Sequence, residues 1–335
     1  METIEEQNTI VKINPKIKIK YPFHKDKELQ SKIALKKEFQ HFFDGELKNY
    51  EEETSKEDFC KFTELAPHQK FIKNFINYDT PYNGILLYHG MGSGKTCSAM
   101  GITEEFRRNN KYNNNFKKII IIASPNVQQN FKLQLFDESK LYKKNKLWYL
   151  DGCVGSGLLQ EIKDYDVENM KKEEIVKIIN NIIKKNYLFV GYGKFANKIR
   201  SMINVNSNSE RAKAYVQKKL KEEYENSMIV IDEAHNLRSI GDNDFKHASD
   251  MIHKLVKHVK KTKLILLSGT PMYNNPREIV FLLNLLNEND NHKTIKENKI
   301  FNKENELIVK DGEEIGKNNL IKLANGYISY VRGDN

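Results

Sequence analysis

Six short apolar segments, separated by stretches with helical spacing, constrain the fold more than any other feature of this sequence. They are Gly84–Tyr88, Ile119–Ala123, Leu147–Leu150, Tyr187–Val190, Met228–Ile231 and Leu264–Leu267. Runs this short that are rich in bulky and β-branched residues are typical of strands buried on both faces. Between them, apolar residues recur at helical intervals, as at Ile175, Ile178, Ile179 and Ile182. Strands that alternate with helices predict an α/β fold with a doubly wound parallel sheet.

A glycine-rich segment directly follows the first predicted strand. Its residues are His89, Gly90, Met91, Gly92, Ser93, Gly94, Lys95 and Thr96. Small residues let backbone N–H groups approach phosphate oxygens, and the helix that follows points its N-terminus at them. Lys95 would reach the β- and γ-phosphates, while the Thr96 hydroxyl would hold Mg²⁺. His89 stands where the usual pattern has glycine, at the position with the least phosphate contact, so we predict that a nucleotide binds here.

Two adjacent carboxylates follow another buried strand, Met228–Ile231. Asp232 would hold Mg²⁺ through water, and Glu233 would accept the proton of the attacking water. An Asp-Glu pair by itself is often an ordinary charged turn, but the phosphate loop upstream favours the catalytic interpretation. Hydrolysis of a phosphoanhydride needs both acids, whereas a kinase does not need the second one here.

Together with the phosphate loop, Asp232–His235 resembles the DEAH box of superfamily 2 helicases and nucleic-acid translocases. Further segments resemble motif III of the Swi/Snf-like branch, motif Ia, the segment that carries an adenine-contacting glutamine, and motif Ib. The segment resembling motif III is Leu264–Asn275, and the one resembling motif Ia is Ala123–Asn126. The glutamine segment is Leu65–Gln69, and the segment resembling motif Ib is Val190–Phe195. The sequence is similar to the helicases of poxviruses and giant DNA viruses. That group includes the early transcription factor small subunit and nucleoside triphosphatase I.

The resemblance implies a RecA-like P-loop lobe that uses ATP and Mg²⁺. It implies that Glu233, Asp232 and Lys95 are catalytic, that Thr96 and Asp232 hold the metal, and that Gln69 contacts adenine. The residues that would couple the γ-phosphate to nucleic acid are His235, Ser268 and Thr270. Those that would contact nucleic acid are Ser124, Asn126, Gly193 and Lys194. Without the resemblance, His235 is equally well a capping or packing histidine, and Ser268–Thr270 a strand followed by a turn.

The charge balance leaves the class of partner open. The chain has 55 Lys and Arg against 45 Asp and Glu, a net charge of +10. A basic chain favours nucleic acid as a partner, because each neutralised phosphate releases counterions. Lysine is, however, common throughout this sequence. The family resemblance favours duplex DNA, with RNA also possible, and includes viral RNA polymerase among the partners. The alternative function is a nucleotide-gated transcription-factor subunit that binds promoter DNA or polymerase without unwinding.

The expected domains are an extension and linker over residues 1–60, the ATP-binding lobe over 61–290, and a polar tail over 291–335. In the extension we expect a strand at Lys16–Tyr21, a helix from Leu29 to Phe43 ended by Gly45, and a linker at Glu46–Asp58. No arginine-rich motif of a second RecA-like lobe follows residue 276. We therefore expect a fragment of a longer protein, with weak hydrolysis on its own, because the second lobe supplies the arginines.

The sequence also indicates where the protein works. The longest apolar runs, Ile119–Ala123 and Ile279–Leu283, are too short to cross a bilayer. The acidic N-terminus does not have the form of a secretory signal. Because Cys60, Cys97 and Cys153 have no paired spacing, we expect no disulfide and no zinc site. An intracellular, reducing location follows, which for a viral protein means the virion and host cytoplasm.

Overall fold

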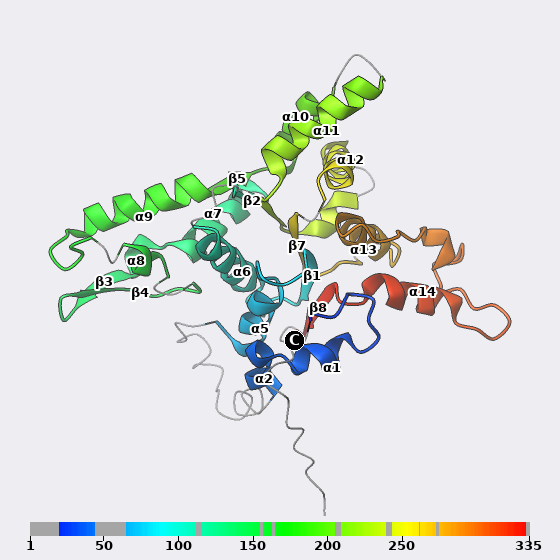
Figure 1. Cartoon of the computed structure of the whole chain (residues 1–335), viewed down its shortest axis with the longest axis horizontal. Helices are drawn as coiled ribbons and strands as arrows, with labels where there is room; N and C mark the ends of the chain where they lie inside the picture. Colours follow the sequence, from blue (N-terminus) through cyan, green and yellow to red (C-terminus); the bar gives the residue numbers. More distant parts are fainter. Residues whose placement is uncertain are drawn as a thin grey trace, which may run out of the picture.

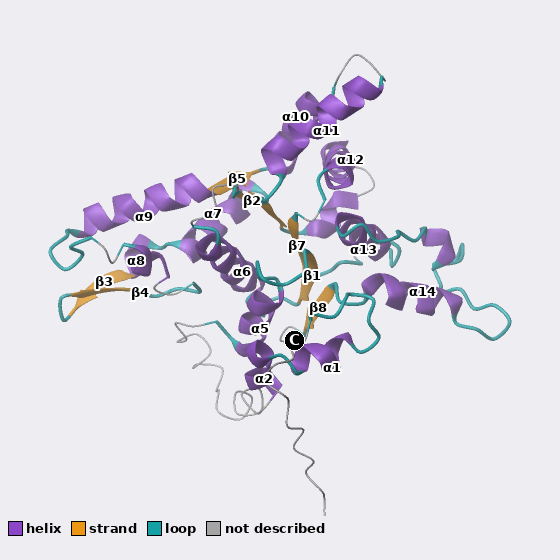
Figure 2. Ribbon diagram, in the orientation of Figure 1, coloured by secondary structure: helices purple, strands orange, loops and turns teal. Residues whose placement is uncertain are grey.

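The computed structural model describes residues 20–43, 65–111, 116–154, 157–162, 165–204, 209–238, 243–260, 262–272 and 275–332. Its centre is a six-stranded sheet in the order β5-β2-β6-β7-β1-β8 (Figures 1 and 2). Every neighbouring pair in this sheet is parallel. The strands are β1 (Gly84–His89), β2 (Ile119–Ile122), β5 (Tyr187–Val190), β6 (Met228–Ile231), β7 (Lys263–Ser268) and β8 (Ile328–Val331). The predicted doubly wound α/β fold is therefore confirmed.

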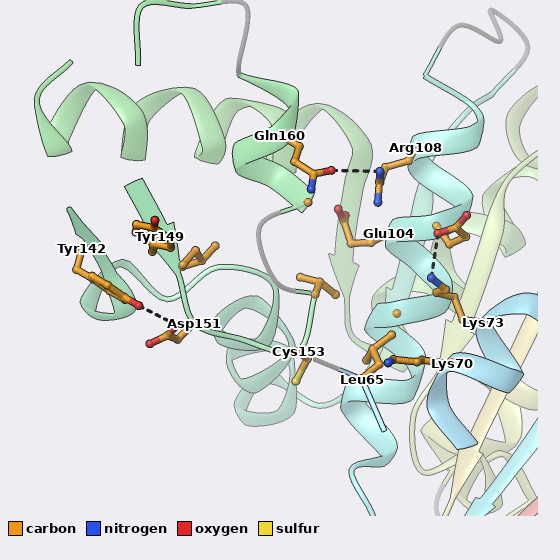
Figure 3. Close-up of a pocket in the computed structure, with 15 residues that line it drawn as sticks. Leu65, Lys70, Lys73, Glu104, Arg108, Tyr142, Tyr149, Asp151, Cys153 and Gln160 are labelled. Carbon is orange, nitrogen blue, oxygen red and sulfur yellow. Dashed lines mark hydrogen bonds and ion pairs between the residues drawn. The ribbon is translucent and has the colours of Figure 1, made fainter. Parts of the chain in front are cut away.

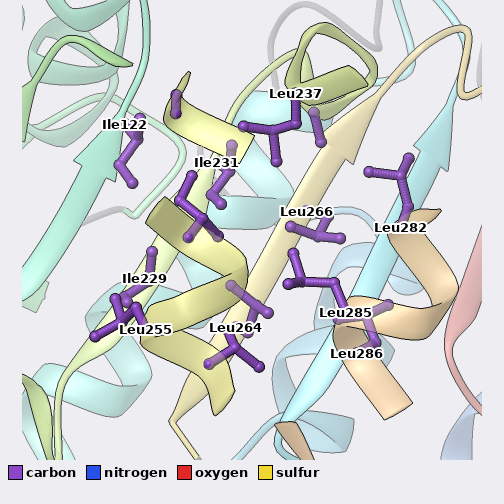
Figure 4. Close-up of a cluster of buried hydrophobic side chains, with 14 of the residues drawn as sticks. Ile122, Ile229, Ile231, Leu237, Leu255, Leu264, Leu266, Leu282, Leu285 and Leu286 are labelled. Carbon is purple, nitrogen blue, oxygen red and sulfur yellow. The ribbon is translucent and has the colours of Figure 1, made fainter. Parts of the chain in front are cut away.

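The central strands are apolar because helices cover both faces of the sheet. Along β1, Leu86 packs into one core cluster, whereas Ile85 and Leu87 pack into the other. All four isoleucines of β2 are buried for the same reason. Figure 4 shows one of the two clusters, in which Ile229, Leu264 and Leu266 lie beneath helices. A continuous apolar run is thus the pattern that two covered faces require.

Each face has its own set of helices. One cluster contains residues of α10 (Tyr192–Ile203), α11 (Glu210–Tyr224), α12 (Asn243–His258), α13 (Glu278–Asn289) and α14 (Ile315–Ala324). The other contains residues of α1 (Leu29–Ala34), α2 (Lys37–Phe43), α5 (Pro67–Phe75), α6 (Lys95–Asn109) and α7 (Pro125–Leu135). Short 3₁₀ turns lie at Glu138–Lys140, Ala234–Arg238 and Glu297–Lys299. Among the described helices, none has the length and hydropathy needed to cross a membrane.

The segment Leu147–Leu150 does not belong to the central sheet, so that prediction was wrong. It forms β4, which pairs antiparallel with β3 (Leu141–Lys144) in a separate hairpin. With Leu147 at 51% and Tyr149 at 40% exposure, β4 lacks the two covered faces of a central strand. The hairpin, α8 (Gly157–Glu161) and α9 (Lys172–Asn186) share a hydrophobic cluster of their own. We call residues 137–186, which project from the lobe in Figure 1, the insertion.

The insertion is attached to α6 by a buried ion network and by a disulfide. Arg107 on α6 binds Glu104 on the same helix and Glu161 on α8, each at 2.7 Å. At the other end of α6, Cys97 is bonded to Cys153, with their Cα atoms 5.3 Å apart. The expectation of no disulfide was therefore wrong. The two cysteines lie 56 residues apart in the sequence, and tertiary folding brings them together.

The lobe also extends beyond the boundary expected at residue 290. Strand β8 pairs with β1, and Leu323 and Tyr327 are buried in the cluster beneath α13. The segment was assigned to a polar tail because β8 is an edge strand that is only partly buried, so its sequence lacks a continuous apolar run. Residues 291–332 are part of the folded lobe.

The described part of the N-terminal extension packs against the lobe. Leu29, Ile33, Phe39 and Phe42 lie in the same cluster as α5 and β1. The expected single helix from Leu29 to Phe43 is two helices, α1 and α2, separated where the Lys36 ammonium lies 4.5 Å from the centre of the Tyr21 ring. The expected strand at Lys16–Tyr21 falls mostly outside the described residues. The linker at Glu46–Asp58 and the helix end at Gly45 lie outside them entirely.

A buried polar group fixes the extension to the end of the chain. The His24 ring is 4% exposed and stacks on Tyr327, with ring centres 4.3 Å apart. The Tyr327 hydroxyl donates to Asp290 at 2.8 Å, and His24 Nδ1 lies 3.8 Å from the same carboxylate. Burial, with smaller effects of His292 and Lys263, lowers the pKa of His24 to about 3. His24 is therefore neutral in the folded protein.

This burial predicts a pH-dependent stability. Below pH 6.5 the unfolded chain protonates His24, while the folded chain stays neutral until about pH 3. The free energy of unfolding should therefore fall with decreasing pH, by up to about 1.4 kcal/mol per pH unit from His24 alone. Urea denaturation between pH 7 and pH 5 should show a smaller pH slope for His24→Gln than for the wild type. Parallel curves for the two proteins would contradict this assignment.

Candidate active site

The predicted site residues meet at one edge of the sheet because its strands are all parallel. The carboxyl ends of β6, β7 and β1, which are neighbours, carry Asp232–His235, Ser268–Thr270 and the glycine-rich loop respectively. In an open α/β sheet, this edge is where ligands bind. The sheet therefore brings together three segments, of which the first and the last are more than 170 residues apart in the sequence.

The loop between β1 and α6 has a backbone shape that favours glycine. Gly92 and Gly94 have φ values of +79° and +73°, in the left-handed region. Gly94 is the N-cap of α6, and its carbonyl accepts from the Ser98 N–H at 2.9 Å. A Cβ atom at Gly92 would find no atom within 4 Å, so the loop is open on that side. The N-terminus of α6 therefore presents its amide groups toward a position suited to an anion.

Gln69 supports this loop. Its amide oxygen accepts from the Ala66 N–H at 2.9 Å, and its amide nitrogen donates to the Gly94 carbonyl at 3.1 Å. The side chain is buried, with 7% of the residue exposed. A Cβ atom on Gly94 would lie 2.5 Å from this amide nitrogen. The residue predicted to contact adenine thus fixes α5 against the phosphate loop, and contact with adenine stays a prediction.

His89 connects the start of the loop to the edge strand. Its Nε2 lies 3.0 Å from the Ser329 hydroxyl on β8, and the next residue, Gly90, donates its N–H to the Val331 carbonyl at 3.0 Å. Burial, followed by the charges of His68 and Lys95, lowers the pKa of His89 to about 4. The ring is therefore neutral near pH 7, and it serves as a hydrogen-bonding group that holds the loop against β8.

The two carboxylates after β6 lie in different environments. Asp232 is 7% exposed, and burial together with the neighbouring Glu233 raises its pKa to about 6, although Lys95 opposes the shift. The Glu233 side chain is 43% exposed, and its Oε1 lies 3.6 Å from Lys95 Nζ. The backbone of Glu233 is left-handed, with φ of +47°, which turns this residue away from the strand direction. One carboxylate is buried beside the phosphate loop, and the other is open to water.

The three segments are joined by a continuous series of side-chain contacts. Glu233 contacts Lys95 through one oxygen, while its other oxygen lies 3.4 Å from His235 Nδ1. The same His235 nitrogen lies 3.0 Å from the hydroxyl of Ser268, which is fully buried. That hydroxyl in turn accepts from the Thr270 N–H at 3.1 Å. Of the residues predicted to couple the γ-phosphate to a partner, His235 therefore contacts the carboxylate predicted to activate water, and Ser268 and Thr270 are connected to it through His235.

The four candidate nucleic-acid residues lie farther along the same edge. Ser124 occupies the N-cap position of α7 after β2, Asn126 lies in the first turn of that helix, and Gly193 and Lys194 lie in the first turn of α10 after β5. Ser124, Asn126 and Lys194 are exposed, and Gly193 is partly buried. Because β5 and β2 are neighbours, these residues form one group beside the β6–β7–β1 site. Their contact with nucleic acid stays a prediction.

Sequence reasoning missed three residues that shape the site. The Tyr192 hydroxyl donates to the backbone carbonyl of Asp232 and fixes the turn that carries both carboxylates. Gly269 lies directly beside Lys95, because a Cβ atom on this glycine would be in van der Waals contact with Nζ at 3.5 Å. Ser329 binds His89 from β8. Tyr192 and Gly269 lie inside segments that resemble family motifs, whereas nothing in the sequence pattern marks Ser329.

The residues at this edge match a nucleotide and a divalent cation chemically. Phosphate requires amide donors and a lysine, which the loop and Lys95 provide. Thr96 and Asp232 carry the oxygen atoms that Mg²⁺ prefers. Asp232 and Glu233 lie beside Lys95, and burial, followed by the negative charge of Glu233, raises the pKa of Asp232. A bound cation would offset this negative charge.

Residues 67–329 match the sequence model of the SNF2-related domain. The chain belongs to this family. The match reaches the first two residues of β8, which supports extending the lobe past residue 290. It also confirms the resemblance drawn from the phosphate loop and the DEAH box.

Similar curated proteins come from large DNA viruses. The chain is 33% identical over 67% of its length to a protein of Invertebrate iridescent virus 3 named as a helicase. It is 28% identical over 80% of its length to a protein of Acanthamoeba polyphaga mimivirus named as an ATP-dependent RNA helicase. The early transcription factor 70 kDa subunit of Melanoplus sanguinipes entomopoxvirus is 25% identical over 79% of the chain. The matched regions span 20%, 23% and 32% of these relatives, respectively.

Among solved structures, the SWI2/SNF2 ATPase core of Sulfolobus solfataricus, in complex with double-stranded DNA, matches with a TM-score of 0.43. The match covers 80% of this chain and 44% of that one, at 18% identity.

The two left-handed glycines of the phosphate loop, Gly92 and Gly94, give a matched test of the role of Gln69. Gly92→Ala should lower the free energy of unfolding by about 1–2 kcal/mol through backbone strain alone. Gly94→Ala should cost about 1 kcal/mol more, because the new methyl group displaces the Gln69 amide from its hydrogen bonds. Urea denaturation measures both. Adding Gln69→Ala should cost less in the Gly94→Ala background than in the wild type, and equal costs would contradict the assigned contact.

Proposed function

We propose that this chain is the ATP-binding lobe of a nucleic-acid-dependent ATPase that hydrolyses ATP with Mg²⁺. The proposal rests chiefly on the continuous contacts from Lys95 through Glu233 and His235 to Ser268, next to a glycine-rich loop at the N-terminus of α6. Hydrolysis that depends on nucleic acid requires three parts, which are a phosphate-binding loop, a solvent-accessible carboxylate and a coupling residue.

Each side chain has a distinct role in this proposal. The loop amides and Lys95 bind the β- and γ-phosphates, and Glu233 accepts the proton of the attacking water. In the structure Lys95 is paired with Glu233. A bound phosphate attracts the Lys95 ammonium, which releases the Glu233 carboxylate for water. The exposure of Glu233, in contrast to the burial of Asp232, fits this division of roles.

Thr96 and Asp232 would hold Mg²⁺, which would neutralise charge on the transferred phosphoryl group. The burial that raises the pKa of Asp232 keeps bulk water away from this carboxylate. Tyr192 holds the backbone of the turn and so keeps Asp232 directed at the loop. Arginines that stabilise the transferring charge would come from a second RecA-like lobe, so we expect slow turnover by these residues alone.

Hydrolysis would drive movement along nucleic acid that contacts Ser124, Asn126, Gly193 and Lys194. Duplex DNA is the favoured substrate because the chain belongs to the SNF2-related family. His235, Ser268 and Thr270 would transmit the state of the γ-phosphate, because a change at Glu233 reaches Ser268 through one imidazole ring. Stimulation of hydrolysis by RNA, in place of DNA, is one outcome of the assay below.

A second function is favoured by one comparison. The similarity to an early transcription factor 70 kDa subunit extends over 79% of the chain. On this alternative the lobe is a nucleotide-gated subunit that binds promoter DNA or a viral RNA polymerase without separating strands. Strand separation requires binding to single strands or tailed duplexes, whereas the alternative requires only blunt duplex DNA or the polymerase.

Two substitutions separate binding from hydrolysis. Glu233→Gln should lower kcat by about 10²- to 10⁴-fold while the Kd for ATP stays within about threefold. Lys95→Ala should weaken ATP binding by at least about tenfold, because it removes a charge-assisted contact. Hydrolysis is measured without nucleic acid, with blunt duplex DNA, with tailed duplex DNA and with single-stranded RNA. Kd comes from fluorescent nucleotide titration.

The matched control is Glu210→Gln on α11, where the side chain is 89% exposed and far in sequence from the site. It should leave both kcat and Kd unchanged. Full hydrolysis by Glu233→Gln, or unaltered ATP binding by Lys95→Ala, would refute the proposed roles. Stimulation by one nucleic acid and not by the others identifies the substrate.

A further inference from the structure

The disulfide joins the phosphate loop helix to the insertion. Cys97 lies in the first turn of α6, directly after Thr96, and Cys153 follows β4. Cys153 also lines a cavity of about 500 Å³ between the insertion and helices α5 and α6 (Figure 3). In Figure 3 the side chains of Tyr149 and Asp151 lie on the insertion side of this cavity, and those of Lys70 and Glu104 on the lobe side. The cross-link is therefore at the boundary between the two.

The surroundings of the two sulfur atoms suit both oxidation states. The amide oxygen of Gln134 on α7 lies 2.8 Å from Cys153 Sγ and 3.6 Å from Cys97 Sγ. After reduction, each thiol would have this oxygen as an acceptor, so breaking the bond does not leave a new donor without a partner. Both cysteines are partly buried and partly exposed. A small thiol or disulfide reagent can therefore reach them.

The disulfide and the ion network attach the insertion at opposite ends of α6. Arg107, near the end of the helix, binds Glu161 of α8 irrespective of redox state. Cys97 is at the beginning of the helix, where its neighbours Lys95 and Thr96 belong to the phosphate site. Reduction removes the attachment at the phosphate end and leaves the other. The redox state therefore changes how firmly the first turn of α6 is held.

We propose that Cys97 and Cys153 form a reversible disulfide whose formation is coupled to nucleotide binding at the phosphate loop. The oxidised chain binds nucleotide more tightly, because the cross-link restrains the first turn of α6 while the loop has the shape described above. This inference rests on the proposed ATP site. Coupling between two sites is reciprocal, so bound nucleotide favours disulfide formation by the same factor.

The reaction requires a small-molecule disulfide as the oxidant. One cysteine thiolate attacks a sulfur atom of the reagent, forms a mixed disulfide and releases one thiol. The second cysteine thiolate then attacks the protein sulfur of that mixed disulfide and releases the second thiol. Two protein thiols become one disulfide, and one reagent disulfide becomes two thiols. Reduction is the reverse sequence.

The experiment uses the full chain with Cys60→Ser, which leaves only these two cysteines. The protein is equilibrated in buffers of defined reduced and oxidised glutathione, with and without saturating Mg·ADP. The oxidised fraction is read from the gel shift after reaction with a maleimide–polyethylene glycol. Mg·ADP should shift the midpoint at least about fivefold toward oxidation, and the Kd for Mg·ADP should be lower by the same factor in the oxidised chain.

The matched control adds Cys153→Ser, which keeps Cys97 beside the phosphate loop. In oxidising buffer this variant can form only the mixed disulfide at Cys97, so its affinity for Mg·ADP should not exceed that of the reduced chain in either buffer. Equal affinities for the oxidised and reduced parent, with no shift of the midpoint, would overturn the coupling and leave the proposed ATP site intact. Absence of Mg·ADP binding in both states would overturn the ATP site as well.

Discussion

The parallel pairing of β1 with β7 on one side and β8 on the other is the constraint on which the site depends. Parallel strands all present their carboxyl ends to the same edge, so pairing of the strands is enough to make segments that are distant in the sequence neighbours. The register places Tyr88 opposite both Ser268 and Tyr330. The register at Tyr88 thus fixes where the phosphate loop begins relative to Ser268 on β7 and to the edge strand β8.

The sequence predicts well those parts of the structure that are determined by residues close together in the chain. Five of the six apolar segments are strands of the sheet, because burial on both faces requires a continuous apolar run. The glycine loop lies between strand and helix, because Gly92 and Gly94 suit a turn with positive φ. In the same way, the acidic pair ends a buried strand, so its position at the sheet edge follows from the strand alone.

The parts that the sequence does not predict depend on tertiary contacts. Segment Leu147–Leu150 has the composition of a core strand, and only its neighbours show that it is half of an exposed hairpin. Strand β8 is an edge strand with a mixed sequence, so its membership in the sheet depends on β1. The pairing of Cys97 with Cys153 has no sequence signature because the chain between them folds into separate elements. The contacts of Gln69 with Ala66 and Gly94 are hidden for the same reason.

The contact between the phosphate loop and β8 has a mechanical consequence. Gly90 is bonded to Val331 and His89 to Ser329, so the final described strand touches the loop directly. A load applied to the chain at Arg332 therefore reaches the first residues of the loop through two hydrogen bonds. Such a load does not have to pass through the hydrophobic core, which resists deformation because it is densely packed. Tension on the chain can thus change the shape of the phosphate loop through these two hydrogen bonds alone.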